Sequence, residues 1–176
     1  RLEEASIFNK SVLKKYGLQI CSMQSIWFGR QENIFGSEKE RVILTEYTKK
    51  AIDFAEQIGC GNLVFGCPRN RNIENKDEKH LDIACTFFKE LGDYASTKNV
   101  VIAIEPNPVI YNTNFLNTTS EVIDFVRRVN NENIKINCDL GTVIYNEESI
   151  EEILEHIDLI NHIHISEPNL APIVHR

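Results

Sequence analysis

The chain has 176 residues, of which 42% are hydrophobic and 26% are charged, a composition typical of one globular domain. Its formal net charge of −7 argues against a protein that holds nucleic acid on a broad basic face, so a nucleic-acid partner is disfavoured. No apolar run approaches the ~20 residues that a membrane span needs, and the five cysteines form no Cys-x-x-Cys pair, which indicates reduced thiols and a cytoplasmic protein.

Helical periodicity recurs along the chain, and three of the repeats begin with a capping box, in which Ser or Thr precedes Glu by three residues. In each repeat, apolar residues three or four positions apart form one face. A glycine follows two of them, as is common where a helix ends. The predicted helices are Phe8–Tyr16, the segment from Ser37 to Gly59, Leu81–Ala95, the segment after Thr118 and Glu121, and the segment after Ser149 and Glu152.

Short apolar runs separate these helices. The run Val100–Ile104 is apolar without alternation, which favours a strand covered on both faces, as in a parallel sheet. Strand–helix repeats with right-handed crossovers leave two main architectures, an open doubly wound sheet and a closed (β/α)₈ barrel. The predicted strands are Leu18–Ser22, Asn62–Phe65, Val100–Ile104, Ile134–Cys138 and Ile160–Ile165.

Polar residues follow three of these strands. Glu105 ends the strand Val100–Ile104, Asp139 ends the strand Ile134–Cys138, and the last strand carries His162 and His164. Because chemistry in parallel α/β folds gathers where strands end, we expect these side chains to converge. Two carboxylates and an imidazole suit a divalent cation such as Mn²⁺, Mg²⁺ or Co²⁺, with Zn²⁺ as a further option.

Each of these residues also has an ordinary structural interpretation. A strand-end Asp or Glu often caps the next helix or accepts loop hydrogen bonds. His162 and His164 are two apart and share a face of a strand, so one of them can be a ligand and the other a supporting histidine. The three strand ends together indicate a metal site more strongly than any one of them.

Other candidates lie in loops after strands. Gly66 is a place where a ligand can approach the backbone, and Arg69 and Arg71 are candidates for holding a phosphate or sugar oxygen, although a solvated basic loop explains Arg71 equally well. Trp27, with neighbouring Phe28, is a candidate aromatic wall, although tryptophan is as often a core residue.

Four segments in order resemble the xylose isomerase-like TIM-barrel superfamily, and within it the sugar phosphate isomerase/epimerase group. They are Phe65-Gly66-Cys67-Pro68-Arg69-Asn70-Arg71, Ile104-Glu105-Pro106-Asn107-Pro108, Asp139-Leu140-Gly141-Thr142 and His162-Ile163-His164-Ile165-Ser166-Glu167-Pro168. No single motif is diagnostic, and the ordered set covers about residues 16–172.

The resemblance implies an α/β fold, the (β/α)₈ barrel, with one divalent metal at its C-terminal mouth. Matched by position, Glu105, Asp139 and His164 are the first three metal ligands, and the fourth, a Glu on the eighth strand, has no counterpart. The chain then forms an incomplete barrel of about strands two to six, a single domain over residues 1–176 that we expect to be cut at both ends, since such barrels take about 250 residues.

The resemblance also implies proton transfer next to a sugar or sugar phosphate carbonyl, through an enediolate, with Glu105 as catalytic residue. Trp27, Arg69, Asn70, His162 and Glu167 are the expected substrate contacts, and a homo-oligomer is allowed for. Since the eighth-strand Glu is half of the epimerases' proton-transfer pair, we expect the fragment alone not to be a competent enzyme.

Three alternatives stay open. An endonuclease IV-like DNA repair hydrolase is disfavoured by the net charge and by Thr142, which stands where many relatives have a histidine. A polyol dehydratase would use every residue named above. A non-catalytic sugar-binding member would use the same mouth without turnover.

Overall fold

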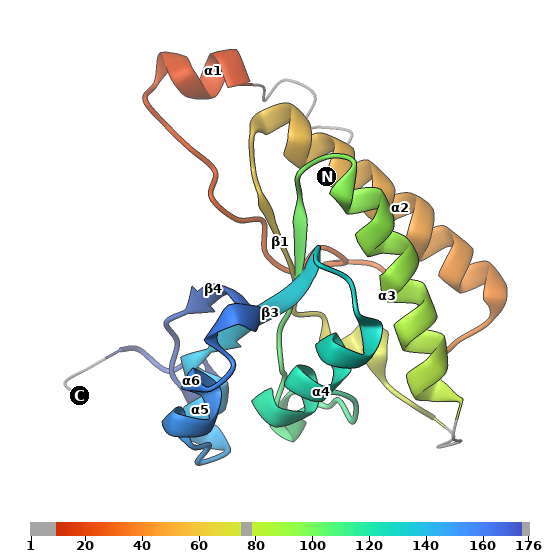
Figure 1. The fold of residues 1–176 in the computed structure, drawn as a ribbon, viewed down its shortest axis with the longest axis vertical. Helices are drawn as coiled ribbons and strands as arrows, with labels where there is room; N and C mark the ends of the chain where they lie inside the picture. Colours follow the sequence, from red (N-terminus) through yellow and green to blue (C-terminus); the bar gives the residue numbers. More distant parts are fainter. Residues whose placement is uncertain (1–9, 75–78, 174–176) are drawn as a thin grey trace.

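Four parallel strands form one curved sheet in the order β1-β2-β3-β4 (Figure 1). The structure is a computed structural model and describes residues 10–74 and 79–173. The strands are β1 Asn62–Phe65, β2 Val101–Ile104, β3 Ile134–Asp139 and β4 Ile160–His164. Although β1 and β4 are the two edges, Asn161 Nδ2 donates a hydrogen bond to Asn62 Oδ1 over 2.7 Å, which requires a strongly curved sheet. The architecture is that of part of a (β/α)₈ barrel.

Helices precede or follow each strand, as a parallel sheet requires. Two of the longer ones, α2 and α3, run side by side along one flank of the sheet, with α4 next to α3 (Figure 1). The helices are α1 Lys10–Lys15, α2 Glu38–Ile58, α3 His80–Ser96, α4 Thr119–Val129, α5 Leu140–Tyr145 and α6 Ile150–Leu154, and short 3₁₀ turns span Pro68–Arg71, Val109–Tyr111, Ile157–Leu159 and Pro168–Leu170.

The predicted capping boxes at Ser37 and Thr118 are confirmed, with reciprocal bonds to Glu40 and Glu121. Each box satisfies backbone N–H groups that a helix start leaves without a partner. Gly59 ends α2 with φ at 77°, a left-handed conformation that glycine adopts without strain. The local sequence therefore sets both ends of α2.

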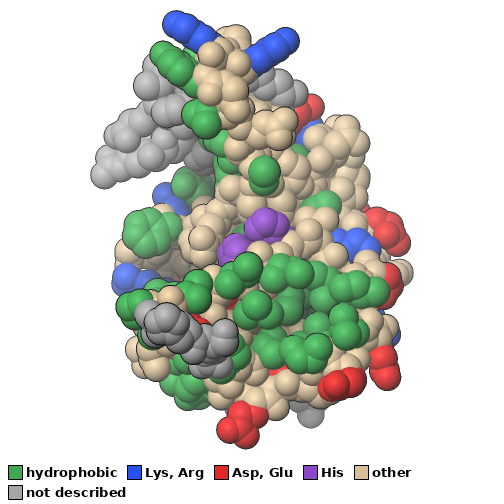
Figure 2. Space-filling model, turned by 90° about the vertical axis from the view of Figure 1, so that its left-hand side faces the viewer, with side chains coloured by type: hydrophobic (Ala, Val, Ile, Leu, Met, Phe, Trp, Pro, Cys, Tyr) green, Lys and Arg blue, Asp and Glu red, His purple; other side chains and the backbone are tan. Residues whose placement is uncertain are grey.

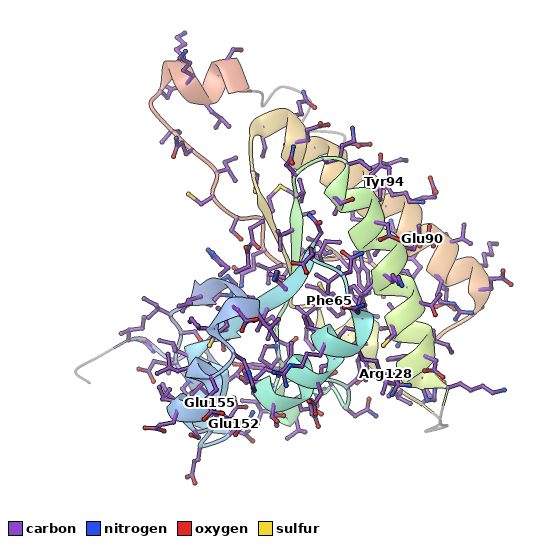
Figure 3. The ribbon with its side chains drawn as sticks, viewed as in Figure 1. Phe65, Glu90, Tyr94, Arg128, Glu152 and Glu155 are labelled. Carbon is purple, nitrogen blue, oxygen red and sulfur yellow. The ribbon has the colours of Figure 1, made fainter. Side chains whose placement is uncertain are left out.

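The core lies between the sheet and helices α2, α3 and α4. Phe65 is completely buried and packs edge-on against Trp27, with the rings 4.7 Å apart, and Figure 3 shows it between the sheet and the helices. On the outer side, Glu90 and Tyr94 of α3 bond to Lys49 and Asp53 of α2. Apolar residues at every second strand position thus hold the helices, and the alternate positions face the inside of the curve.

Two predictions about elements need correction. The predicted strand Leu18–Ser22 is not a strand; the chain meets β1 slightly later, through one isolated parallel bridge between Met23 and Leu63. Leu18 is 60% exposed, so this run buries too little to fix a strand. Helix α5, which follows β3 directly, was not predicted. Phe8, where the first predicted helix begins, lies outside the described residues.

Hydrophobic side chains also gather on one face of the surface, beside histidine side chains (Figure 2). Exposed apolar residues of the C-terminal part include Leu154, Ile163 and Ile165, exposed by 58%, 53% and 73%. Ile163 pairs with Cys138, whose side chain packs with the helices, so Ile163 lies on the outer face of β4. Within the described residues, no helix is long and apolar enough to cross a membrane.

Candidate metal and catalytic site

Three neighbouring strands bring Glu105, Asp139 and His164 to one point. Glu105 follows β2 directly, Asp139 ends β3 and His164 ends β4. One ligand atom from each lies within 4.8 Å of the others. Glu105 is buried, whereas Asp139 and His164 are half-buried, so the group opens toward solvent at the carboxyl ends of the strands. The structure brings together the three residues that the sequence predicts as ligands.

A bulge in β4 aims the histidines inward. Ile136 pairs with Ile160, but the next pair is Asn137 with His162, so Asn161 is an extra residue on β4. Ile160 packs on the core side, and the extra residue turns His162 and His164 to the inside of the sheet. Without the shift, a strict alternation from Ile160 would leave both histidines on the same face as that core residue.

The Glu105 carboxylate has three polar neighbours. His164 Nδ1 lies 2.5 Å from its Oε1 and Asn137 Nδ2 lies 2.7 Å from the same atom, while Asn107 Nδ2 is 3.4 Å from Oε2. The hydrogen bond to Glu105 raises the pKa of His164, against the lowering effect of burial, and the charges of Glu105 and Asp139 add to the rise. Because a carboxylate oxygen accepts, His164 Nδ1 is the donor in this contact with Glu105 Oε1.

Asp139 serves two structural roles at once. Its Oδ2 caps helix α5 by accepting from the Thr142 backbone N–H at 2.8 Å, with the Thr142 hydroxyl 3.0 Å away. Its Oδ1 accepts from the Ser166 hydroxyl at 2.6 Å. The capping interpretation of this residue is therefore correct, and it does not conflict with metal binding, because a carboxylate has about four lone pairs.

Two glycines leave room for the carboxylates. A Cβ on Gly66 would collide with Glu105 Oε2 and lie 2.9 Å from Glu105 Cδ. A Cβ on Gly141 would collide with the Ser166 hydroxyl and lie 3.2 Å from Asp139 Oδ2. The sequence suggested that Gly66 admits a ligand to the backbone; its role in the fold is to make space for the Glu105 side chain.

Arg71 is completely buried, so it does not belong to a solvated loop. Its guanidinium donates to the carbonyls of Phe65 and Glu105, each at 2.9 Å, and lies 4.2 Å from the centre of the Phe65 ring. Burial lowers the pKa of Arg71 to about 10. This side chain ties the carboxyl ends of β1 and β2 together beneath the site, and it is not available to a phosphate.

The predicted substrate contacts fall into two groups. Trp27 has no exposed surface, and its Nε1 donates to the Thr48 hydroxyl at 2.8 Å, so the structure corrects the predicted aromatic wall: Trp27 is a core residue. Asn70 is also buried, and its amide holds the carbonyls of Arg30 and Glu32, which corrects its predicted sugar contact.

The remaining three predicted contacts differ in burial: Arg69 is exposed, His162 is half-buried and Glu167 is buried. Arg69 is exposed, next to the buried loop residues. The His162 ring lies 5.3 Å from the His164 ring and nearly perpendicular to it, and burial together with His164 lowers the pKa of His162. Glu167 is buried next to Gly141. Of these, His162 lies beside His164, and the Glu167 backbone lies against Gly141, two residues after Asp139.

The donor set fits a divalent cation. Two carboxylates near one another repel, and a carboxylate as buried as Glu105 needs a compensating positive charge. Mixed oxygen and nitrogen donors are the ligands that Mn²⁺, Mg²⁺, Co²⁺ and Fe²⁺ take in proteins. Asn137, which contacts both Glu105 and His164, is a site residue that the sequence did not single out. Its position two residues before Asp139 on an inward-facing row was the available signal.

Residues 9–176 match the family described as "Xylose isomerase-like TIM barrel". No curated protein matches the sequence. Among solved structures, the chain is similar to 3-keto-D-glucoside 4-epimerase from E. coli, with a TM-score of 0.75 and 16% identity over 96% of this chain and 65% of that one.

Two further structures are similar to the chain. D-allulose 3-epimerase from Methylomonas sp. gives a TM-score of 0.73 and 23% identity, over 90% of this chain and 55% of that one. AP endonuclease, family 2, from Brucella melitensis gives a TM-score of 0.75 and 16% identity, over 89% of this chain and 62% of that one. The chain thus spans 55–65% of the length of these three structures. Identities this low support the shared fold alone.

Proposed function

Because this chain belongs to the xylose isomerase-like TIM-barrel family, we propose that it carries the catalytic site of a divalent-metal-dependent sugar or sugar phosphate isomerase/epimerase. The observation that supports this most is the convergence of Glu105, Asp139 and His164 at the carboxyl ends of three strands. Similar structures include epimerases that act on keto-sugars, one of them in complex with D-allulose. A ketose is therefore the substrate to test first.

Glu105, Asp139 and His164 would hold the cation, which would act as a Lewis acid on a carbonyl oxygen. Glu105 is the proposed base that removes the proton from the carbon next to that carbonyl, leaving an enediolate. Its burial strengthens electrostatic interactions with the substrate, and Asn137 and Asn107 fix the carboxylate. His162, whose ring lies against that of His164, and Glu167 are the residues proposed to position hydroxyl groups.

Hydrogen exchange with solvent tests the proposal most directly. The form of the protein used includes the eighth-strand Glu that the resemblance implies. It is loaded with Mn²⁺ and incubated with D-allulose or D-fructose in D₂O, and deuterium at C3 is followed by NMR. This measurement reports proton removal by Glu105 even where return of the proton to the opposite face is slow.

Glu105→Gln is the matched variant, since it keeps size and polarity and removes the base. We expect exchange to fall at least 100-fold in this variant, in line with the contribution of a general base. Exchange at the wild-type rate would show that Glu105 is not the base. Binding of metal and sugar with no exchange in the wild-type protein would favour a non-catalytic sugar-binding role.

The similarity to an AP endonuclease family 2 structure makes metal-dependent hydrolysis of abasic DNA the second candidate. Thr142 occupies the place of a histidine in many relatives, and its hydroxyl lies near Asp139 and the Pro106 carbonyl instead of offering a nitrogen ligand. Nicking of an abasic duplex by the Zn²⁺-loaded protein, without exchange on any ketose, would reverse the order of the two proposals.

A further inference from the structure

Asn137 is a completely buried amide in the middle of strand β3. Its neighbours along the strand, Ile136 and Cys138, point to the helix side, so Asn137 points to the inside of the sheet. The register pairs Ile104 with Ile136, and one step further along both strands brings Asn137 beside Glu105. On the other side, Asn137 pairs with His162 of β4.

Three polar atoms meet at this amide. Asn137 Nδ2 is 2.7 Å from Glu105 Oε1 and 2.9 Å from His164 Nδ1, and these last two atoms are 2.5 Å apart. A carboxylate oxygen only accepts, so Asn137 donates to Glu105 Oε1. If a cation took the lone pair of His164 Nδ1, that nitrogen could no longer donate to Oε1, and Asn137 would be the donor that still holds Oε1.

The oxygen of the Asn137 amide supports a functional role. Asn137 Oδ1 is buried and has no hydrogen-bond partner among the described residues. Turning the amide over would place Oδ1 against the Glu105 carboxylate, so the orientation is fixed by charge. A buried amide that satisfies only one of its ends is a poor packing residue compared with leucine or valine. The fold keeps it where it touches two ligands.

We propose that Asn137 is a positioning residue that holds Glu105 and His164 in one arrangement for the cation and for proton removal. The role in proton removal rests on the proposed function. The role in holding the two ligands does not, because it concerns the geometry of this chain alone.

The test compares two buried asparagines of the same sheet. Asn137→Leu removes the donor and keeps an apolar side chain of similar volume. Asn62→Leu is the matched control, because Asn62 is 4% exposed and bonded to Ser22 and Asn161 at the amino end of β1, away from the ligands. Binding of Mn²⁺ to the metal-free proteins is measured by electron paramagnetic resonance, and thermal unfolding is measured in parallel.

We expect Asn137→Leu to weaken Mn²⁺ binding by about 10–100-fold, the range typical for residues that support metal ligands, and Asn62→Leu to leave it within about twofold. A merely structural role would lower the unfolding temperature of both variants and leave Mn²⁺ binding unchanged in both. Mn²⁺ binding by Asn137→Leu within twofold of wild type would therefore overturn the proposal.

Crystal structures of the metal-free wild-type and Asn137→Leu proteins decide the matter independently of metal binding. The proposal expects the Glu105 carboxylate and the His164 ring to separate in the variant, and it is overturned if they stay together as in the wild type. Asn137→Asp, which keeps the volume and replaces the donor by an acceptor, serves the same comparison if the leucine variant does not fold. Wild-type protein that binds Mn²⁺ without exchanging ketose hydrogens would refute the proposed function and leave this comparison valid.

Discussion

Gly66→Ala is the substitution that most directly probes how the fold makes room for Glu105. The Gly66 backbone lies outside the left-handed region, so alanine is compatible with its conformation. The new methyl group would collide with Glu105 Oε2 and lie 2.9 Å from Cδ, while Glu105 Cβ at 3.7 Å stays in ordinary contact. The strain therefore falls on the carboxylate and not on the backbone.

The carboxylate has little freedom to move away. It is 6% exposed, and Asn137, His164 and Asn107 contact it from other directions. Overpacking of this kind costs about 1–3 kcal/mol, and a displaced carboxylate also loses a hydrogen bond of about 1 kcal/mol. We expect the free energy of unfolding to fall by ~2–4 kcal/mol, which lowers the unfolding temperature by about 4–16 °C for a chain of this length. Mn²⁺ binding is expected to weaken as well, because Glu105, a proposed ligand, is moved.

A double-mutant cycle separates the collision with Glu105 from other effects of Gly66→Ala. Gly66→Ala is measured by urea unfolding in the wild-type background and in Glu105→Ala, which lacks the colliding atoms. Gly61→Ala is the control, because a Cβ at Gly61 meets nothing within 4 Å. We expect the cost of Gly66→Ala to drop below about 1 kcal/mol when Glu105 is alanine, since interacting neighbours are non-additive. An equal loss in both backgrounds would refute the steric explanation.

Three further outcomes are expected. Cys21, which is exposed, should react rapidly with a thiol reagent at pH 8, whereas Cys67 in the folded protein should react very slowly, because burial raises its pKa to about 11 and leaves a thiolate fraction of about 0.001. The rate at Cys67 should rise with pH toward that value; fast labelling in the native state at pH 8 would contradict its burial. Arg71→Met should lower the free energy of unfolding in urea by about 3 kcal/mol, because two buried carbonyls lose a charged donor. Arg71→Lys should recover less than half of that loss. A loss below about 1 kcal/mol in Arg71→Met would contradict this explanation. Trp27→Ala should lower the free energy of unfolding by about 3–5 kcal/mol and leave Mn²⁺ binding by the folded protein unchanged. A large change in Mn²⁺ binding would indicate that Trp27 contributes to the site.

Much of the local structure follows from sequence patterns alone. The capping boxes at Ser37 and Thr118 predict two helix starts, because the interactions involved span only three residues. The apolar run Val100–Ile104 predicts a buried parallel strand, which the structure shows as β2. Functional residues in parallel α/β folds gather at strand ends, and this rule selects Glu105, Asp139 and His164 as candidate site residues from the sequence.

Contacts between distant segments decide the features that the sequence missed. The sequence predicts an exposed Arg71, either holding a ligand or in a solvated loop, and fits Trp27 equally well as a core residue and as an aromatic wall. Only the packing of the 3₁₀ turn and of the loop before α2 against β1 buries both side chains. The run Leu18–Ser22 has strand-like composition, but the bridge to β1 forms at the next residue, Met23. Local composition does not encode such choices, because their energy comes from partners in other segments of the chain.

Some features of the candidate site likewise follow from the sequence, and others depend on tertiary contacts. The sequence by itself determines which ligand types are present and that they follow successive strands, because strand ends and side-chain chemistry are local properties. The tertiary structure alone decides that His164 faces inward, since this depends on the extra residue Asn161 against β3. It also decides that Asn137 holds Glu105 and that Gly66 must lack a side chain, because both depend on atoms that belong to a neighbouring strand and come within contact distance only when the sheet curves.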